Sequence, residues 1–437
     1  MKRLIPTLLT CLLLLSACSS TGTNPASTPT PTPTSKPSQP PTPISTISDI
    51  CPKAIGNSNC ITPHTLRLAY GVQSLIDQGY TGKGQTIIDI VSYGSPTLQH
   101  DIDIFDQQFH LPPITIQVIS PLGTVPYDPN NKEMFGWAVE TGLDVEIMHA
   151  IAPDAHIIVM TSPVDETEGT IGLPEFLQLE QYAVAHHLGQ IFSQSYVASE
   201  VTLADSAGQQ LVQQFTAFYK QITTQQGYTV VNGSGDHGAT DWANIAMTQL
   251  SPKAIVNFPA DVPWVTAVGG TTLLHSNGTF TENAWSGSGG GTSTFFAEPD
   301  FQKSLPASIQ SLLNGQRGIP DIAADANPDT AMVDYIGGQW TEVGGTSAST
   351  PLMAGIIAIA NQMAGHPLGF INPGIYKIAA AQNTAQYFRD TINGSNAVDK
   401  GNIHVTGFIA QTGWDAVTGW GSPQASQFIP ALIAALK

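Results

Sequence analysis

Gly344-Gly-Thr-Ser-Ala-Ser-Thr-Pro351 leads directly into a long apolar run, residues 352–360. Such a run predicts a buried helix, whose amino terminus would favour negative charge developing beside Ser347. The small residues before the run allow a backbone to approach a bound substrate. Serine is also a common helix N-cap, but Ser349 is available for that role. We therefore interpret Ser347 as a candidate nucleophile at a strand-to-helix junction.

Short β-rich apolar runs precede this segment and predict buried strands at residues 86–91, 156–160, 189–192, 229–232 and 265–268. Helical patterns lie between them at residues 139–150, 173–187 and 205–226. This alternation predicts an α/β fold, a parallel sheet with helices on both faces, in a single large catalytic domain. In such sheets the working residues collect beyond the carboxyl ends of the strands.

Two acidic residues share one face of the predicted helix at 139–150. Glu140 and Asp144 are four residues apart in Glu-Thr-Gly-Leu-Asp, which places them about one turn apart. Like charges at this spacing are unfavourable unless the two carboxyl groups share a proton, which raises the pKa of one of them. Acidic pairs are common on helices, so this motif points to chemistry only in combination with others.

Asp236 stands in the glycine-rich turn Gly-Ser-Gly-Asp-His-Gly, directly after a predicted strand. An ionised carboxylate would repel an oxyanion, whereas a protonated Asp can donate a hydrogen bond to it. That role requires a raised pKa or acidic surroundings. The alternative is an Asp that satisfies backbone amides in its own turn.

The content and order of these segments resemble the sedolisin family, the serine-carboxyl peptidases with a subtilisin-like fold. The resemblance covers roughly residues 62–437. Beyond the three segments above, it is carried by residues 139–155, 258–273, 285–291 and 317–329. It implies an S53-type acyl-transfer site in which each residue has a role: Ser347 is the nucleophile, Glu140 the general base and acid, Asp144 its proton partner and Asp236 the oxyanion stabiliser. It also places Ser195 in the substrate groove.

A carboxylate base suits work in acid. A histidine is mostly charged below pH ~6 and cannot accept the serine proton, whereas a carboxylate with a pKa near ~4 still can. We therefore expect an acid-acting endopeptidase that cleaves proteins or peptides. The alternative from another class is a catalytically inactive surface lipoprotein that uses the peptidase fold for binding.

Two other hydrolase types fit the sequence less well. A histidine-dependent subtilisin needs an Asp at the end of the first strand, and Asp89 falls two residues early. His149 lies on the Glu140 helix, but its offset from Asp144 points it elsewhere. An esterase of the α/β-hydrolase type would need a Gly-x-Ser-x-Gly elbow, which the sequence lacks.

The sequence departs from the family pattern in two places. Where some members add an acidic residue at the first strand, the aligned stretch here is Ile90-Val-Ser-Tyr93, which predicts a shorter proton network. Members are also usually made with a long folded propeptide. Residues 19–60 could not fold as such a domain, so we expect the usual propeptide to be lacking.

The resemblance further implies one calcium ion near the carboxyl terminus. The matching segments are Arg-Asp-Thr at 389–391 and Gln-Thr-Gly-Trp-Asp at 411–415. They supply the side chains of Asp390 and Asp415 and the carbonyl groups of Thr391, Gln411 and Gly413. An all-oxygen set suits Ca²⁺ and is poor for zinc. The alternative is an Asp-rich surface turn.

The amino-terminal region predicts export. Lys2 and Arg3 precede a short apolar run that ends in Leu-Ser-Ala-Cys18, which resembles a bacterial lipobox. We expect a lipoprotein signal peptide at residues 1–17, a Ser/Thr/Pro-rich tether at 18–50 and the catalytic domain at 51–437, with a lipid on Cys18 anchoring the chain at the cell surface. A plain signal peptide cut nearby is the alternative.

Cys51 and Cys60 lie in the exported part of the chain, separated by eight residues. Because oxidising compartments favour pairing, we predict a disulfide between them rather than two free thiols.

Composition excludes one class of partner. The 437 residues carry 33 acidic and 15 Lys or Arg side chains, for a formal net charge of −18. No basic stretch could neutralise phosphates, so we expect no nucleic-acid partner. Charged residues make up only 11% of the chain, so protonation in acid causes little self-repulsion. We expect a monomer.

Overall fold

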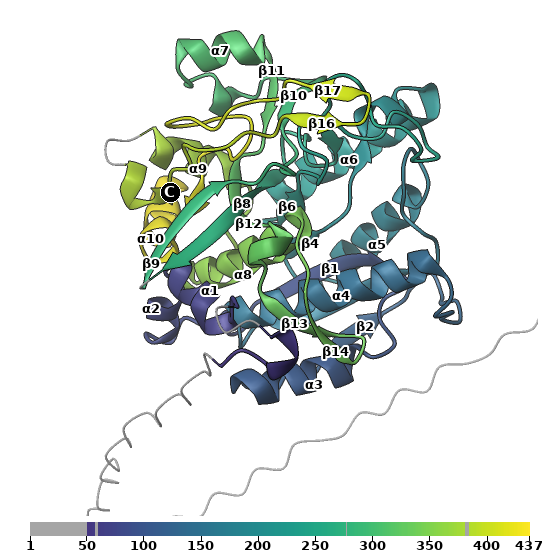
Figure 1. Ribbon diagram of the computed structural model, residues 1–437, viewed down its shortest axis with the longest axis vertical. Helices are drawn as coiled ribbons and strands as arrows, with labels where there is room; N and C mark the ends of the chain where they lie inside the picture. Colours follow the sequence, from purple (N-terminus) through teal and green to yellow (C-terminus); the bar gives the residue numbers. More distant parts are fainter. Residues whose placement is uncertain (1–49, 57–59, 277, 381–383) are drawn as a thin grey trace, which may run out of the picture. The chain divides into compact units, whose positions relative to one another are not determined.

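A central parallel sheet organises residues 50–56, 60–276, 278–380 and 384–437, the part of the chain that the computed structural model describes (Figure 1). The strand order is β12-β8-β6-β4-β1-β3-β2, and β9 joins β8 in antiparallel fashion. The strands are β1 (Thr86–Ser92), β2 (Gln117–Ile119), β3 (His156–Ser162), β4 (Ile191–Gln194), β6 (Thr229–Gly233), β8 (Thr266–Ser276), β9 (Thr279–Ala284) and β12 (Ile322–Asp325).

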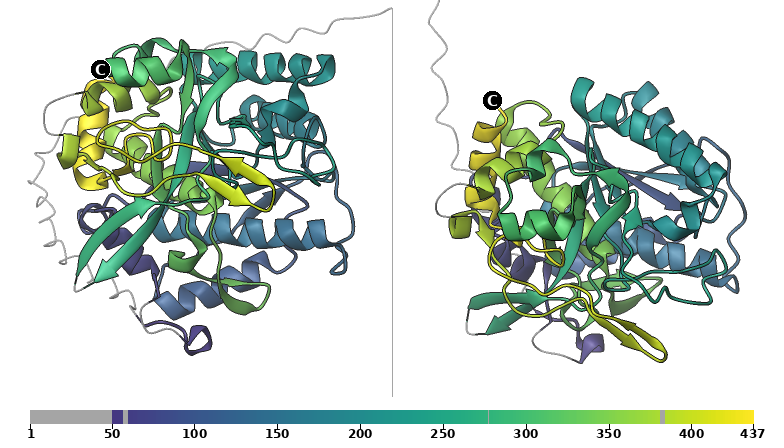
Figure 2. Two further views of the ribbon diagram at one scale, coloured as in Figure 1. Left: turned by 45° about the horizontal axis from the view of Figure 1, so that its top comes forward. Right: turned by 90° about the horizontal axis from the view of Figure 1, so that it is seen from above.

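Helices cover both faces of this sheet because the strands are apolar on both sides. On β1, Ile87 and Val91 belong to the core shared with α4 and α8, whereas Ile88 and Ile90 belong to the core shared with α5 and α6. Figure 2 shows α6 on the opposite side of the sheet from α8 and α10. The helices are α1 (Pro63–Ala69), α2 (Gln73–Ile76), α3 (Leu98–Phe109), α4 (Lys132–Ile151), α5 (Leu173–Ala185), α6 (Ser206–Gln225), α7 (Ala307–Leu313), α8 (Thr346–Ala364), α9 (Asn372–Ala379) and α10 (Ala425–Ala435).

Short antiparallel pairs and 3₁₀ helices decorate the rim. The pairs are β5 (Ala198–Ser199) with β7 (Asn257–Phe258), β10 (Gly291–Ala297) with β11 (Gln316–Ile319), β13 (Val333–Ile336) with β14 (Gln339–Glu342), β15 (Phe388–Arg389) with β18 (Ser422–Pro423), and β16 (Val398–Lys400) with β17 (Ile403–Val405). The 3₁₀ helices are η1 (Lys53–Ile55), η2 (Glu200–Leu203), η3 (Asp300–Gln302), η4 (Pro328–Thr330) and η5 (Thr384–Gln386).

The predicted fold class is confirmed. The five predicted strands are β1, β3, β4, β6 and β8, which lie side by side in the sheet. The helix predicted at 139–150 begins earlier, at Lys132, because the Asn131 side chain caps it by accepting hydrogen bonds from the amides of Glu133 (2.9 Å) and Met134 (3.3 Å).

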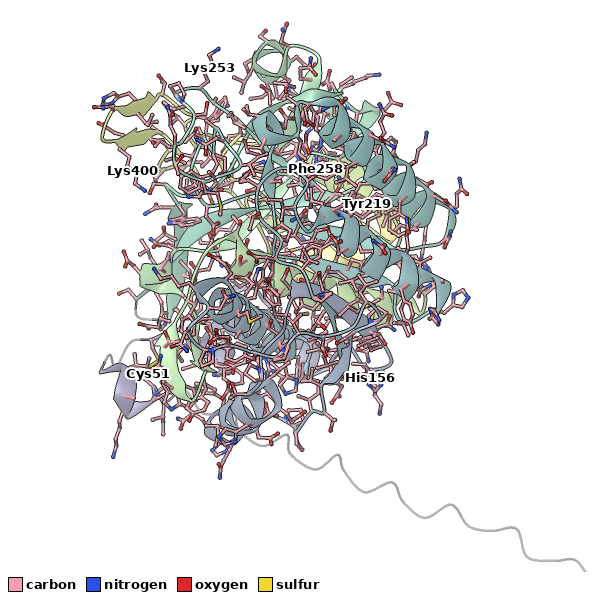
Figure 3. All side chains as sticks on the ribbon, turned by 90° about the vertical axis from the view of Figure 1, so that its right-hand side faces the viewer. Cys51, His156, Tyr219, Lys253, Phe258 and Lys400 are labelled. Atoms are coloured by element: carbon pink, nitrogen blue, oxygen red, sulfur yellow. A yellow bond between two sulfur atoms is a disulfide. The ribbon has the colours of Figure 1, made fainter. Side chains whose placement is uncertain are left out.

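The predicted disulfide between Cys51 and Cys60 is confirmed, and Cys51 is labelled in Figure 3. The predicted signal peptide and nearly all of the predicted tether, including Cys18, lie outside the described residues. Within the described ranges, no helix is both long and apolar enough to cross a membrane.

Buried carboxyl groups lie beside one another at two places near the sheet. Glu146 on α4 accepts a hydrogen bond from the Tyr335 amide (2.8 Å), and its pKa is raised by burial and by the neighbouring charge of Asp334. Glu200 and Asp261 flank the hydroxyl of Ser293, 2.6 and 2.9 Å away. Burial and then Glu200 raise the pKa of Asp261. Such neighbours favour a retained proton over two charges.

Candidate active site

Ser347 lies in the first turn of α8, at the edge of a cleft of about 380 Å³. Gly345 precedes the helix with φ of 125°, which disfavours any residue with a side chain. A Cβ atom on Gly345 would lie 2.5 Å from Oδ2 of Asp236. Glycine is therefore required for the nucleophile turn to approach Asp236 this closely.

Pro351 changes the hydrogen bonding of this first turn. It has no N–H group, so the carbonyl of Ser347 receives no helical hydrogen bond from the residue four positions on. That carbonyl oxygen instead lies 3.4 Å from the hydroxyl of Ser195, which follows β4. The Ser195 hydroxyl also donates to Oδ1 of Asp144 at 2.8 Å. Ser195 thus connects α8 to α4, and its predicted place in the cleft is confirmed.

Glu140 and Asp144 project from α4 toward Ser347 and Ser195. Glu140 lines the cleft and is within hydrogen-bonding reach of both hydroxyl groups, whereas Asp144 is fully buried behind it. Burial, and then the charge of Asp144, raise the pKa of Glu140 well above its ordinary value. The structure therefore brings together the carboxyl pair and the serine that the sequence singled out separately.

Asp89 is a third carboxyl group next to the pair of Glu140 and Asp144. The prediction of a shorter proton network was therefore wrong. Asp89 lies in β1 on the face toward α4, is fully buried, and is within hydrogen-bonding reach of Asp144. Burial raises the pKa of Asp89 to about 8. The acidic residue lies at position 89, one position before the stretch 90–93 on which the prediction rested. The pleat of β1 places Asp89 on the same face as Val91, which was the available signal.

Asp236 follows β6 and closes the other side of the cleft. Its Oδ1 accepts hydrogen bonds from the amide (2.7 Å) and the hydroxyl (2.9 Å) of Thr346. Removal from water raises the pKa of Asp236, although the two bonds from Thr346 oppose the shift. Oδ1 is therefore fixed as an acceptor, and Oδ2 is the oxygen that can carry a proton.

No histidine of the described residues is placed to act as the base for Ser347. Among the described residues that line the cleft, the one histidine is His237, whose Nδ1 lies 3.2 Å from a carboxylate oxygen of Asp241. His149 points away from the cleft, with Nε2 3.0 Å from Asp106. The arrangement contradicts a histidine-dependent subtilisin.

A buried polar network that no sequence pattern indicates holds the end of β4. Glu180 on α5 accepts hydrogen bonds from Gln194 (2.8 Å), Tyr196 (3.0 Å) and Tyr219 (3.0 Å). Tyr219 lies on α6, where Figure 3 labels it. Gln194 and Tyr196 flank Ser195, so this network fixes the backbone that carries the Ser195 hydroxyl.

The structure also gathers the residues predicted to bind calcium. Asp390 accepts a hydrogen bond from the Gly413 amide (2.9 Å), and Asp415 accepts one from the Gln411 amide (3.0 Å). Asp415 also organises its own turn by accepting from the amides of Val417 and Thr418. Over the described ranges no group of three or more His, Cys, Asp or Glu could hold a metal. The predicted set contains two carboxylates and completes its shell with carbonyl groups, so its oxygens fit Ca²⁺.

Known proteins share both sequence and fold with this chain. The model of the subtilase family matches residues 123–421. Kumamolisin from a Bacillus species is 32% identical over 282 residues, covering 62% of this chain and 46% of that protein. Tripeptidyl-peptidase sed4 from Aspergillus fumigatus is 28% identical over 389 residues, covering 79% and 60%. The chain spans about half the length of the curated relatives it matches.

A solved structure matches the fold over nearly its whole length. Pseudomonas sedolisin, a serine-carboxyl proteinase in complex with two molecules of pseudo-iodotyrostatin, superposes with a TM-score of 0.68 and 25% sequence identity. The match covers 84% of this chain and 96% of that one. With the family model matched over most of the domain, the chain belongs to the subtilase family of serine peptidases, as a sedolisin-like member.

Proposed function

We propose that this protein is an acid-acting serine-carboxyl endopeptidase that hydrolyses peptide bonds in proteins. The observation that carries the proposal is the approach of a carboxyl group, Glu140, to Ser347, with the carboxyl group of Asp236 on the other side of the cleft. A carboxylate base and a carboxylic acid donor complement each other in acid, where a histidine base would be charged.

The reaction begins with attack of the Ser347 hydroxyl oxygen on the substrate carbonyl carbon. Glu140, ionised, accepts the hydroxyl proton as the new C–O bond forms. Negative charge then develops on the former carbonyl oxygen. The protonated Oδ2 of Asp236 and the backbone N–H of Ser347 donate to this oxyanion.

Collapse of the tetrahedral intermediate breaks the C–N bond and leaves an acyl group on Ser347. Glu140 returns its proton to the departing nitrogen, so the amine leaves neutral. A water molecule then repeats the sequence: Glu140 takes a proton from the water, the oxyanion forms again, and the Ser347 oxygen leaves with the proton.

Asp144 and Asp89 act behind Glu140. Their carboxyl groups face each other in a fully buried environment, which favours a proton held between them. This proton limits the negative charge next to Glu140 and lets it ionise when Ser347 needs a base. Ser195 fixes the orientation of Asp144 through its hydrogen bond.

Asp390, Asp415 and the carbonyl groups of Thr391, Gln411 and Gly413 would hold a calcium ion. The ion would supply positive charge and cross-link two segments far apart in the sequence. We assign it a structural part only.

Export as a lipoprotein anchored through Cys18 at a bacterial cell surface, and a monomeric state, are part of the same proposal. They rest on the amino-terminal sequence and on composition.

The test is hydrolysis of a denatured protein from about pH 2 to 8 by the wild type, Ser347→Ala and Glu140→Gln. We expect activity in acid that both substitutions abolish. Activity confined to neutral pH and unaffected by Glu140→Gln would contradict the carboxylate base. A folded wild type with calcium that is inactive at every pH would favour the binding-lipoprotein alternative. Mass spectrometry of the products distinguishes internal cleavage from release of tripeptides.

A further inference from the structure

The cleft beside Ser347 carries an excess of carboxyl groups. Besides Glu140 and Asp236, its lining includes Glu133, Glu166, Glu168 and Asp241. Within the described part of the chain, no Lys or Arg lines this cleft. The reaction uses two of the six carboxyl groups, so the others need a different explanation.

Glu166 lies in the wall of the cleft, and one of its two carboxylate oxygens is buried without a hydrogen-bond partner. It is 7% exposed, and its Oε1 atom is buried with no hydrogen-bond donor. The amide of Glu166 donates to the Ser92 hydroxyl (3.0 Å), which anchors the loop between β3 and α5 against the end of β1. An unpaired carboxyl group in such a position costs several kcal/mol if it is ionised without a counter-charge.

Glu168 lies on the same loop and is held in place from one side. Its Oε2 accepts hydrogen bonds from the Ser199 amide (2.9 Å) and the Thr202 hydroxyl (2.7 Å), and the side chain is 3% exposed. Fixed neutral donors orient this carboxylate without neutralising it. The charge of Asp241 lies close enough to act on Glu168, so the two belong to one electrostatic cluster.

The cation nearest to the cluster is already engaged. His237 pairs with Asp241 at 3.2 Å, and Asp241 further accepts hydrogen bonds from Asn257 (2.7 Å) and from the Trp242 amide (2.7 Å). One imidazolium therefore offsets one carboxylate. Apart from a weak influence of His237 on Glu168, Glu166 and Glu168 have no cation among the described residues that line the cleft.

The position of these carboxyl groups relative to Ser347 indicates which part of a substrate would lie next to them. Strands β4 and β6 are parallel neighbours, and the residues after each, 195–197 and 235–237, form two walls of the cleft. A substrate carbonyl placed between Ser347 and Asp236 would bring the side chain of its own residue close to these walls. The loop with Glu166 and Glu168 lines the same cleft.

We propose that Glu166 and Glu168 make this crevice selective for a basic side chain, Lys or Arg, on the substrate residue that supplies the scissile carbonyl. This inference rests on the proposed peptidase function. The ammonium or guanidinium group provides the counter-charge that the protein lacks, and its hydrogens reach the unpaired oxygen of Glu166. The alternative is that protonated carboxyl groups bind a neutral or acidic side chain at this place, and the test distinguishes the two.

The experiment compares peptides that are identical except for Lys, norleucine or Glu at the residue before the cleavage site. Values of kcat/KM are measured for the wild type, Glu166→Gln, Glu168→Gln and, as a matched control, Glu175→Gln on α5, which does not line the cleft. We expect the wild type to prefer Lys over norleucine by about tenfold or more, and each cleft variant to lower that ratio by about tenfold, the scale of a charged hydrogen bond. Glu175→Gln should keep the wild-type ratio.

Binding provides a second readout that needs no turnover. N-acetylated tripeptides ending in Lys, norleucine or Glu are titrated into Ser347→Ala by calorimetry, because as acyl products they place the last side chain in the crevice. Tighter binding of the Lys peptide supports the proposal. If the wild type cleaves nothing while the Lys peptide still binds best, the peptidase function fails and the basic subsite stands.

Three results would overturn the subsite. They are equal kcat/KM for Lys and norleucine in the wild type, a preference for Glu, or a Lys preference that neither Gln variant changes. If either Gln variant fails to fold, the wild-type ratio and the titrations decide alone.

Discussion

Asp89 on β1 and Asp144 on α4 face each other with fully buried carboxyl groups, and burial is the main cause of the raised pKa of each. A proton between them satisfies both residues, whereas two ionised groups would repel each other in a medium of low dielectric constant. The packing of α4, which carries Glu140, against β1 therefore depends on whether the carboxyl pair holds a proton.

Asp89→Asn tests this coupling. The pKa of Asp89, about 8 in the folded protein, lies above its ordinary value of ~3.9, so the folded state binds more protons than the unfolded state. The stability contributed by this proton is present below about pH 4 and is lost as pH rises toward 8. In Asp89→Asn an amide donates to Asp144 instead, so we expect the free energy of unfolding to decline less over this range.

Urea denaturation at about pH 4, 6 and 8 measures that decline. Asp103→Asn, an exposed position on α3, is the matched control and should follow the wild type. An unchanged decline in Asp89→Asn would contradict the shared proton.

Ser195→Ala removes the hydroxyl that joins Asp144 to the Ser347 carbonyl. Hydrogen bonds to charged groups contribute about 1.5–3 kcal/mol, so we expect kcat to fall by roughly 10- to 100-fold with a smaller change in KM. Ser193→Ala is the control, since the buried Ser193 hydroxyl has no partner. A rise in KM at constant kcat would mean that Ser195 contacts substrate only.

Asp236→Asn separates donation from ionisation. The pKa of Asp236 is raised, and activity should disappear as pH rises through it, because the ionised form can no longer donate to the oxyanion. An Asn can accept from Thr346 through Oδ1 and donate at every pH. We therefore expect a lower maximum rate but no loss on the alkaline side from this group.

Asp236→Ala is the comparison and should lose about 10²–10³-fold in kcat at all pH values. The measurement is the pH profile of kcat for the three proteins. Identical alkaline limbs in the wild type and Asp236→Asn would show that another group controls that limb.

Calcium should stabilise the carboxyl-terminal segments. A ligand that binds only the folded state raises Tm, so we expect a chelator to lower Tm and added Ca²⁺ to restore it. Asp390→Ala should abolish the response, whereas Asp399→Asn, exposed on the β16–β17 hairpin, should retain it. The measurement is Tm with and without the chelator. A wild-type Tm that neither the chelator nor added Ca²⁺ changes would contradict the calcium site.

The fold was predictable because its signals are local. Buried strands and helices have distinct periods, and β1, β3, β4, β6 and β8 each carry short apolar, β-rich stretches. The glycine-rich turns around Asp236 and Ser347 were predictable for the same reason, because few residues tolerate such backbone geometry.

Contacts between distant elements were not predictable. Asp89 approaches Asp144 only because α4 packs on β1 in one rotational setting, which no spacing within either segment records. The same holds for Glu180, whose partners come from α6 and from the segment around the end of β4. The early start of α4 depends on the side chain of Asn131, a single residue among several polar ones.

The hydrogen ion acts as a bound ligand of this fold. Its sites are three pairs of neighbouring carboxyl groups: Asp89 with Asp144, Glu146 with Asp334, and Glu200 with Asp261. Each pair can hold a proton that the unfolded chain surrenders at neutral pH, so folding obeys mass action in hydrogen ions. If the folded state binds three more protons than the unfolded state, a tenfold fall in hydrogen-ion concentration multiplies the equilibrium constant of unfolding by up to about 10³. The native state therefore keeps protons that the unfolded chain has already lost, and its stability falls steeply and reversibly as the pH rises, a titration built from side chains alone.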